Sequence, residues 1–303
     1  MVHERHFHVG YVVMFFLALL LYSGCAGGGV SESSYRSGSQ GIELRWAQGN
    51  QYDFFEGEPV SLLLDVRNRG SHPVQQQDMK LFLTGGFDRT YLPLEINQVP
   101  GTLEGRTRFD PRGDFGELIT IGMNQPARLP VHRKEFAQSV HVTACYRYKT
   151  QTFASACVDP DPFNRRLASK ACQLNVRGYG AQGHPVVVNR IDPVVAGNDI
   201  RYTIYFSNQG RGTVYSPSLS LDACGLNTYE QRSTNVVTAT AMLGSRSLRC
   251  EPTGLVRLIN NQGMLVCTCQ NCLEDNAFET TLTVELSYIY GSSISTNIRL
   301  YSD

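Results

Sequence analysis

The chain has 303 residues, of which 42% are hydrophobic and 18% charged, so it can form one large domain or two ordinary ones. Lysine plus arginine and aspartate plus glutamate both number 27, and neither sign gathers into a block. A nucleic-acid surface needs clustered cations, so this class of partner is disfavoured. Tyrosines (15) and phenylalanines (14) against a single tryptophan favour strand-rich structure.

The N-terminus has the features of an export signal. Tyr11 to Tyr22 is an uninterrupted apolar run of twelve residues. A membrane-spanning helix needs about 20 apolar residues, so this length is typical of a signal-peptide core. Ser23 and Gly24 follow and precede Cys25, which resembles the lipobox of prokaryotic lipoproteins, although Tyr22 stands where that pattern usually has leucine.

The lipobox resemblance implies that residues 1–24 are removed and that Cys25 is lipidated and becomes the new N-terminus. Residues 25–40 would then form a disordered, Gly- and Ser-rich tether to the outer face of the cell membrane. Two alternatives stay open at this point: ordinary cleavage that leaves Cys25 as a free thiol, and an uncleaved N-terminal anchor.

The chain repeats itself at an offset of about 140 residues. The punctuating residues Gly57, Asn68 and Gly70 match Gly197, Asn208 and Gly210. The alternating residues of the following strands also match, Leu62, Leu64 and Val66 with Tyr202, Ile204 and Phe206. At an offset of 142, Phe136, Val140, Val142, Tyr146 and Tyr148 match Phe278, Leu282, Val284, Tyr288 and Tyr290. We therefore predict two copies of one module, residues 41–175 and 182–303, joined by a linker at 176–181.

Each copy begins with a turn glycine, an alternating strand and an Asn-x-Gly turn, where we expect a positive φ. Short strands without 3.6-residue periodicity predict an all-β chain with two tandem immunoglobulin-like antiparallel β-sandwiches. The G-E-x-V…V-x-N-x-G pattern around residues 57–70 resembles the start of the CARDB-type adhesion modules of archaeal and bacterial surface proteins. That resemblance implies a fold and a compartment, but no activity.

Eight cysteines follow Cys25, namely Cys145, Cys157, Cys172, Cys224, Cys250, Cys267, Cys269 and Cys272. Disulfides are the first interpretation for an exported chain. Residues 145 and 157 flank a segment that resembles a hairpin with a loop at 150–152, which favours a bond between them; the rival is Cys157–Cys172. Full pairing needs one bond between the copies, for which Cys172 is the natural donor. Cys250 and Cys267 flank a second hairpin and are expected to pair.

Cys267, Cys269 and Cys272 also raise a metal hypothesis. With a fourth thiolate from Cys224 or Cys250, they could form a tetrahedral zinc site. Only one C-x-x-C spacing occurs, however, and alternate residues of a strand point to opposite faces, so disulfides remain the favoured interpretation.

No catalytic motif is recognisable, and we predict no cofactor and no enzymatic activity. Asp159 and Asp161 could offer oxygens to Ca²⁺, but the Asp-Pro steps are more typical of a shaped, solvated loop. Residues 101–122 have no counterpart in the second copy, and loops on rigid sandwiches often carry recognition. Their side chains Arg106, Arg108, Arg112 and Phe115 are our candidates for a binding surface.

The sequence thus predicts a lipid-anchored surface protein with a structural or adhesive role, bound to an envelope protein or polymer. One alternative is an accessory subunit of a membrane complex or appendage that binds through strand edges. The other is a metal-binding protein or enzyme that uses the Cys267–Cys272 cluster.

Overall fold

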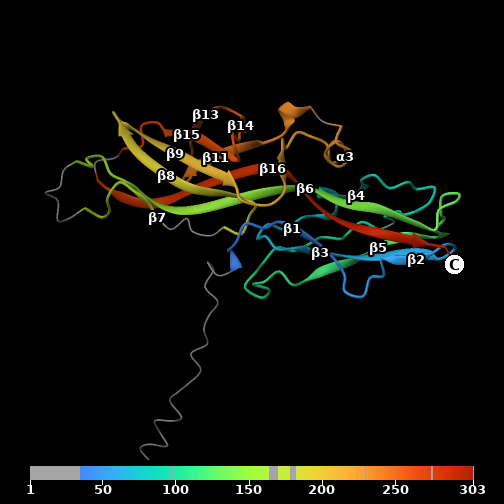
Figure 1. The fold of residues 1–303 in the computed structure, drawn as a ribbon. Helices are drawn as coiled ribbons and strands as arrows, with labels where there is room; N and C mark the ends of the chain where they lie inside the picture. Colours follow the sequence, from blue (N-terminus) through green and yellow to red (C-terminus); the bar gives the residue numbers. More distant parts are fainter. Residues whose placement is uncertain are drawn as a thin grey trace, which may run out of the picture. The chain divides into compact units, whose positions relative to one another are not determined.

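The computed structural model describes residues 35–96, 98–163, 170–177, 182–228, 230–273 and 276–302 (Figure 1). These residues belong to one compact unit. The expected leader, Cys25, most of the tether and positions 178–181 of the linker lie outside the described residues. Within the described ranges, no helix has the length and apolarity that a membrane span requires.

The prediction of an all-β chain is confirmed. The strands are β1 (Ile42–Trp46), β2 (Asp53–Phe55), β3 (Pro59–Asn68), β4 (Met79–Thr84), β5 (Gly116–Pro126), β6 (Glu135–Val158), β7 (Val176–Arg177), β8 (Val186–Ala196), β9 (Asp199–Asn208), β10 (Thr213–Tyr215), β11 (Val236–Leu243), β12 (Arg246–Ser247), β13 (Arg249–Glu251), β14 (Leu255–Arg257), β15 (Gln262–Cys269) and β16 (Phe278–Tyr301). The described residues also form the short helix α3 (Leu221–Gly225) and the 3-10 turns η1 (Gln76–Asp78) and η2 (Gln231–Ser233).

Alternation of apolar and polar residues explains why β3 and β9, the two segments that match each other at the offset of 140, are strands. In β3, Leu62 and Leu64 are fully buried, while their neighbour Leu63 faces outward. In β9, Tyr202 and Ile204 are buried in the same way. A side-chain period of two places one face of each strand in the core, so these two segments form strands rather than helices.

The strands form three sheets. One has the order β1-β3-β5, a second has the order β13-β15-β9-β8, and the third has the order β12-β11-β16-β6-β4, with β2, β7, β10 and β14 attached to its members. Each strand pair of the described residues is antiparallel except that of β16 with β2.

The centre of the fold is a ribbon made of β6 and β16, each 24 residues long. They pair along their whole length, from Phe278 opposite Val158 to Tyr301 opposite Glu135. At about 3.3 Å per residue, such a strand is about 80 Å long. Figure 1 shows the two strands running side by side between the other sheets.

The ribbon relates the two copies by an approximate twofold axis. Arg147 and Ile289 are equivalent under the offset of 142 (289 − 147), and they lie opposite each other in the register. Tyr146 and Tyr148 lie opposite Tyr290 and Tyr288. Each last strand therefore starts in its own copy, passes the axis and continues into the other copy.

The same hydrogen bonds recur on both sides of this axis. The Tyr148 hydroxyl donates to Asn68 Oδ1 (3.4 Å), and the Tyr290 hydroxyl donates to Asn208 Oδ1 (3.2 Å). The tyrosines before them, Tyr146 and Tyr288, accept from the backbone N–H of the first residue of β1 and of β8, respectively. The duplication seen in the sequence thus corresponds to one repeated hydrogen-bonding arrangement.

This arrangement explains why residues 70 and 210 are glycines. The reason is not the positive φ that we expected at the two Asn-x-Gly turns. Neither has a positive φ; that conformation belongs to Gly57 and Gly197. A Cβ on Gly70 would lie 1.8 Å from the hydroxyl oxygen of Tyr148, and one on Gly210 would lie 2.1 Å from that of Tyr290. Glycine is needed because the tyrosine approaches the backbone too closely for any side chain.

All eight cysteines after Cys25 are in disulfides. The pairs are Cys145–Cys224, Cys157–Cys172, Cys250–Cys267 and Cys269–Cys272. The Cys250–Cys267 prediction is confirmed, and Cys157 takes the rival partner, Cys172. The bond between the copies is made by Cys145 with Cys224, so the assignment of Cys172 to this role is wrong.

The expected Cys145–Cys157 bond is wrong because the hairpin that would bring these residues together does not exist. β6 runs without a turn through residues 150–152. Twelve residues of extended strand separate the two sulfurs by about 40 Å. The segment contains no Gly, Pro or Asn to start a turn, and its threonines favour extended backbone.

The zinc hypothesis for Cys267, Cys269 and Cys272 is also wrong. Cys267 is bonded to Cys250, and Cys269 to Cys272, so none of the three is a thiolate. The expectation that Cys267 and Cys269 point to opposite faces is wrong, because residues two apart on a strand share a face and both are buried on the same face of β15. Their partners differ because Cys267 lies opposite Cys250 of β13, whereas Cys269 bonds to Cys272, three residues later in the chain.

Candidate functional site

Two segments of the first copy break the approximate symmetry and are therefore not demanded by the fold. The first is the long connection between β4 and β5, which contains the predicted binding loop. The second is the excursion between β6 and β8, which the Cys157–Cys172 disulfide closes at its base. Both present side chains that the core does not use.

Arg106 of the predicted binding loop is directed inward. Its guanidinium donates to Ser37 O (2.9 Å) and to Gln40 Oε1 (3.3 Å), and its backbone N–H donates to Gly70 O. Burial lowers the pKa of this arginine. Arg106 therefore fastens the loop to the start of the folded chain and is not a free contact for a partner.

The other three predicted residues are at the surface, together with one that the sequence reasoning missed. Phe115 is 76% exposed, and Phe109 is 80% exposed with the Arg108 guanidinium carbon 4.6 Å from its ring centroid. Arg112 is also exposed and forms a 2.7 Å ion pair with Asp114. An apolar side chain in a polar, arginine-rich loop was the available signal for Phe109.

The loop is held in shape by its own polar groups. The Asp110 carboxylate accepts the backbone N–H of Asp114 (3.0 Å) and of Phe115 (3.1 Å). Thr107 Oγ1 accepts the N–H of Phe109 (3.2 Å). These bonds fix the backbone on which both phenylalanines stand, so the rings are presented rather than folded away.

The exposed apolar surface continues onto the sheet. Leu118 of β5 is 59% exposed and Leu63 of β3 is 39% exposed. Leu118 lies opposite Asp65, and Leu63 lies opposite Thr120, so the two leucines are diagonal neighbours on the outer face of the sheet. We call Leu63, Phe109, Arg112, Phe115 and Leu118 the loop patch.

An ion-pair network borders the loop patch. Arg69 bridges Glu43 (2.9 Å) and Asp114 (2.7 Å). Burial raises the pKa of Glu43, but hydrogen bonds from Arg69 and Arg45 outweigh it and hold that pKa below its ordinary value. The hydrogen bond from Arg69 likewise lowers the pKa of Asp114. The network stays ionised at neutral pH and gives the patch a charged rim.

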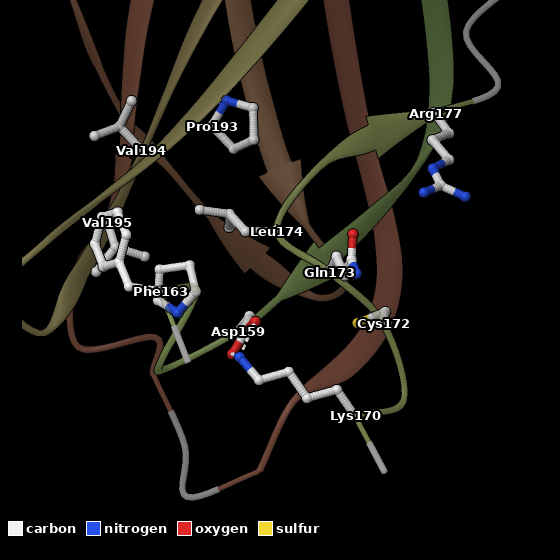
Figure 2. Close-up of a pocket in the computed structure, with 11 residues that line it drawn as sticks. Asp159, Phe163, Lys170, Cys172, Gln173, Leu174, Arg177, Pro193, Val194 and Val195 are labelled. Atoms are coloured by element: carbon white, nitrogen blue, oxygen red, sulfur yellow. Dashed lines mark hydrogen bonds and ion pairs between the residues drawn. The ribbon is translucent and has the colours of Figure 1, made fainter. Parts of the chain in front are cut away.

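The second segment borders an open cleft of about 890 Å³, which we call the side cleft (Figure 2). Its walls come from the excursion and from β8, and they consist of Asp159, Pro162, Phe163, Lys170, Cys172, Gln173, Leu174, Arg177, Pro193, Val194 and Val195. Figure 2 shows Lys170 reaching Asp159 at one end of the cleft, with Arg177 set apart from that pair.

The charged groups at this end are matched to each other. The Lys170 ammonium donates to both carboxylate oxygens of Asp159 (2.7 and 3.0 Å) and to the carbonyl of Asp161. Asp159 is only 2% exposed, so this carboxylate is neutralised inside the protein. The Lys170 ammonium occupies the position beside Asp159 and Asp161 in which the calcium hypothesis placed Ca²⁺. The solvated-loop interpretation also does not hold for Asp159, because this residue is buried.

Neither surface contains a recognisable catalytic arrangement. In the ranges that the structure describes, no group of three or more His, Cys, Asp or Glu side chains is placed to hold a metal ion. Ser71 Oγ lies 3.1 Å from His184 Nε2, but the same hydroxyl donates to Gln182 O (2.9 Å) and so holds the first residue after the linker.

Comparisons with known proteins add little. No family model matches the chain, and no curated protein matches it. Among solved structures, the secreted serine protease VesC from Vibrio cholerae aligns with 10% identity and a TM-score of 0.22, over 83% of this chain and 50% of that one. The chain thus spans about half the length of that protease. A likeness this low supports no conclusion on fold or activity.

Proposed function

We propose that this protein is an exported, membrane-tethered surface lipoprotein without catalytic activity, which binds an envelope component through the loop patch. The observation that carries the proposal is the presentation of Phe109 and Phe115, 80% and 76% exposed, on a backbone fixed by Asp110. Large apolar side chains exposed together and bordered by polar groups mark interaction sites.

Two features support the compartment. The eight paired cysteines are typical of an oxidising, extracytoplasmic environment. The apolar run that ends before Cys25 is the corresponding export signal. We further propose that lipid on Cys25 attaches the protein, and that its two copies are variants of immunoglobulin-like, CARDB-type modules.

A protein is the favoured partner. Arginine and aromatic residues dominate the binding energy of protein interfaces, and the loop patch combines Arg112 with two phenylalanines and two leucines. An envelope polymer is the alternative, and it would contact the same aromatic rings.

A photo-crosslinking amino acid at position 115 tests this proposal in intact envelopes. The matched control carries it at position 264, because Met264 is 52% exposed on β15, away from the loop patch. We expect one discrete adduct from position 115 and none from 264, and we expect its loss in a Phe109→Ser variant. A polymer would give a broad, protease-resistant adduct. Equal labelling from both positions would contradict a specific patch.

The lipoprotein assignment has its own test, the intact mass of protein extracted from membranes. We expect a chain that starts at Cys25, carries lipid and is eight hydrogens lighter than its reduced form, as four disulfides require. A mass that still contains residues 1–24 overturns the proposed attachment.

The accessory-subunit alternative is favoured by the side cleft. β8 is the edge strand of its sheet, and its residues Pro193–Val195 form one wall of the cleft. A partner strand could add to this edge. This alternative would be selected if Val194→Asp abolished binding of the envelope partner while Phe109→Ser left that binding intact.

A further inference from the structure

The β6–β16 ribbon has the geometry of an interface between two partners. Its register is symmetric about the Arg147–Ile289 pair, and its two strands come from equivalent positions of the two copies. An isologous contact between identical subunits has this property, in which residue i meets residue j and j meets i. Here both subunits are parts of one chain.

Each copy gives the second part of its last strand to the other. The second part of β6 docks on the second copy, where Thr150 Oγ1 donates to Val186 O (2.6 Å) and Thr152 Oγ1 donates to Gln182 Oε1 (2.8 Å). The second part of β16 docks on the first copy, where Ser292 Oγ donates to Ile42 O (3.2 Å). The exchange is therefore reciprocal.

The exchanged segments fill the core of the copy that receives them. Ile298 and Leu300 of β16 are 0% and 1% exposed, and Ala154 and Ala156 of β6 are 3% and 0% exposed. Parallel pairing of Leu300 with Phe54 also joins β16 to β2 of the first copy. Without the partner, each copy would lack a central strand and would expose apolar surface.

Two covalent links also join the copies, and one of them starts within the ribbon, where Cys145 of β6 lies opposite Gly291 of β16. The peptide connection runs through residues 178–181, and the Cys145–Cys224 disulfide provides the second link. Neither supplies the buried apolar contacts or the ladder of β6 with β16.

We infer that the chain is a fused, strand-exchanged dimer. Residues 35–177 and residues 182–302 are specific binding partners. Each part completes the core of the other even when the chain between them is cut. It can also complete the corresponding part of a second copy of the chain. This binding activity goes beyond the proposed function.

The test uses the full chain with a protease site inserted within 178–181 and with Cys145→Ala and Cys224→Ala, so that no covalent link remains after cleavage. We expect the two fragments to co-elute at the mass of the uncut chain. After unfolding and refolding with an excess of an untagged cut chain, a tagged first fragment should retain untagged second fragment in a 1:1 ratio. Elution of the fragments apart from each other in native buffer overturns the inference.

Matched substitutions show whether the exchanged strands carry the association. In β16, Ile298→Asp places a charge in the core of the first copy, and Asn297→Asp places it on the exposed side of the same strand. In β6, Ala154→Asp and Phe153→Asp form the reciprocal pair. We expect the buried substitutions to weaken fragment association on the order of a hundredfold and the exposed ones to change it little. Equal effects within each pair would refute the role of strand exchange.

Discussion

Removal of the Cys145–Cys224 disulfide is expected to be the most costly of the four disulfide deletions. The bond closes a loop with a sequence separation of 79 residues, and the chain-entropy relation gives about 4.5 kcal/mol for a loop of this length. The nested Cys157–Cys172 bond, with a separation of 15, shortens the loop and reduces this figure by only about 0.2 kcal/mol. Both sulfurs are buried, at 0% and 1% exposure, so their loss also leaves a cavity.

The measurement is the free energy of unfolding in guanidinium chloride for a Cys145→Ala/Cys224→Ala variant and for a Cys157→Ala/Cys172→Ala control. The control closes the shorter loop, for which the same relation gives about 3 kcal/mol. We therefore expect the first deletion to cost at least about 1.3 kcal/mol more than the second. Equal costs, or a non-reduced peptide map that joins Cys145 to Cys157, would refute the reasoning.

Two further predictions concern single sites. Burial lowers the pKa of His184 to about 3, so the folded protein does not take up the proton that the unfolded chain binds below pH 6.5. The stability that depends on neutral His184 is complete above pH 6.5 and decreases as the pH falls toward 3, by about 2 kcal/mol at pH 5. Urea titrations at pH 7 and pH 5 should therefore show a smaller decrease in the free energy of unfolding for His184→Asn than for the unmodified protein. Gly70→Ala should lower the free energy of unfolding by about 1–3 kcal/mol, because the added Cβ would meet Tyr148. Gly86→Ala, where a Cβ has nothing within 4 Å, should leave the thermal unfolding temperature unchanged. Equal shifts in that temperature for the two variants would show that the close approach of Tyr148 does not matter.

The sequence predicts the parts of the fold that depend on local pattern. Alternation identified β3 and β9, and the Asn-x-Gly turns after them mark the ends of both strands. Cys250 and Cys267 were paired correctly because they flank a local hairpin and lie opposite each other in the register. In each case the signal lies in a short stretch of sequence, 17 residues for the Cys250–Cys267 pair.

The strand exchange could not be predicted in this way. A last strand that folds back within its own copy would bury the same alternating residues as one that crosses to the other copy. The choice depends on whether residues 150–152 turn, and three polar residues without glycine or proline gave too weak a signal against a hairpin. Once β6 was assigned a turn, Cys145 was assigned the wrong partner.

The candidate site was predicted in part. Phe115, Arg108 and Arg112 are at the surface as a binding loop requires, while their role in binding stays a prediction. Arg106 could not be distinguished from them, because its inward direction depends on Ser37 and Gln40, more than 60 residues away. The side cleft depends on the closure of the excursion by Cys157 and Cys172 and on its approach to β8, which no local pattern encodes.

The length of the β6–β16 ribbon has a mechanical consequence. A pull along the strand direction loads all 24 register pairs in shear at once, so many hydrogen bonds must break together before the strands slide. A pull across the ribbon would open the same pairs one after another. The molecule should therefore resist tension along β6 and β16 far better than peeling from either end of the ribbon.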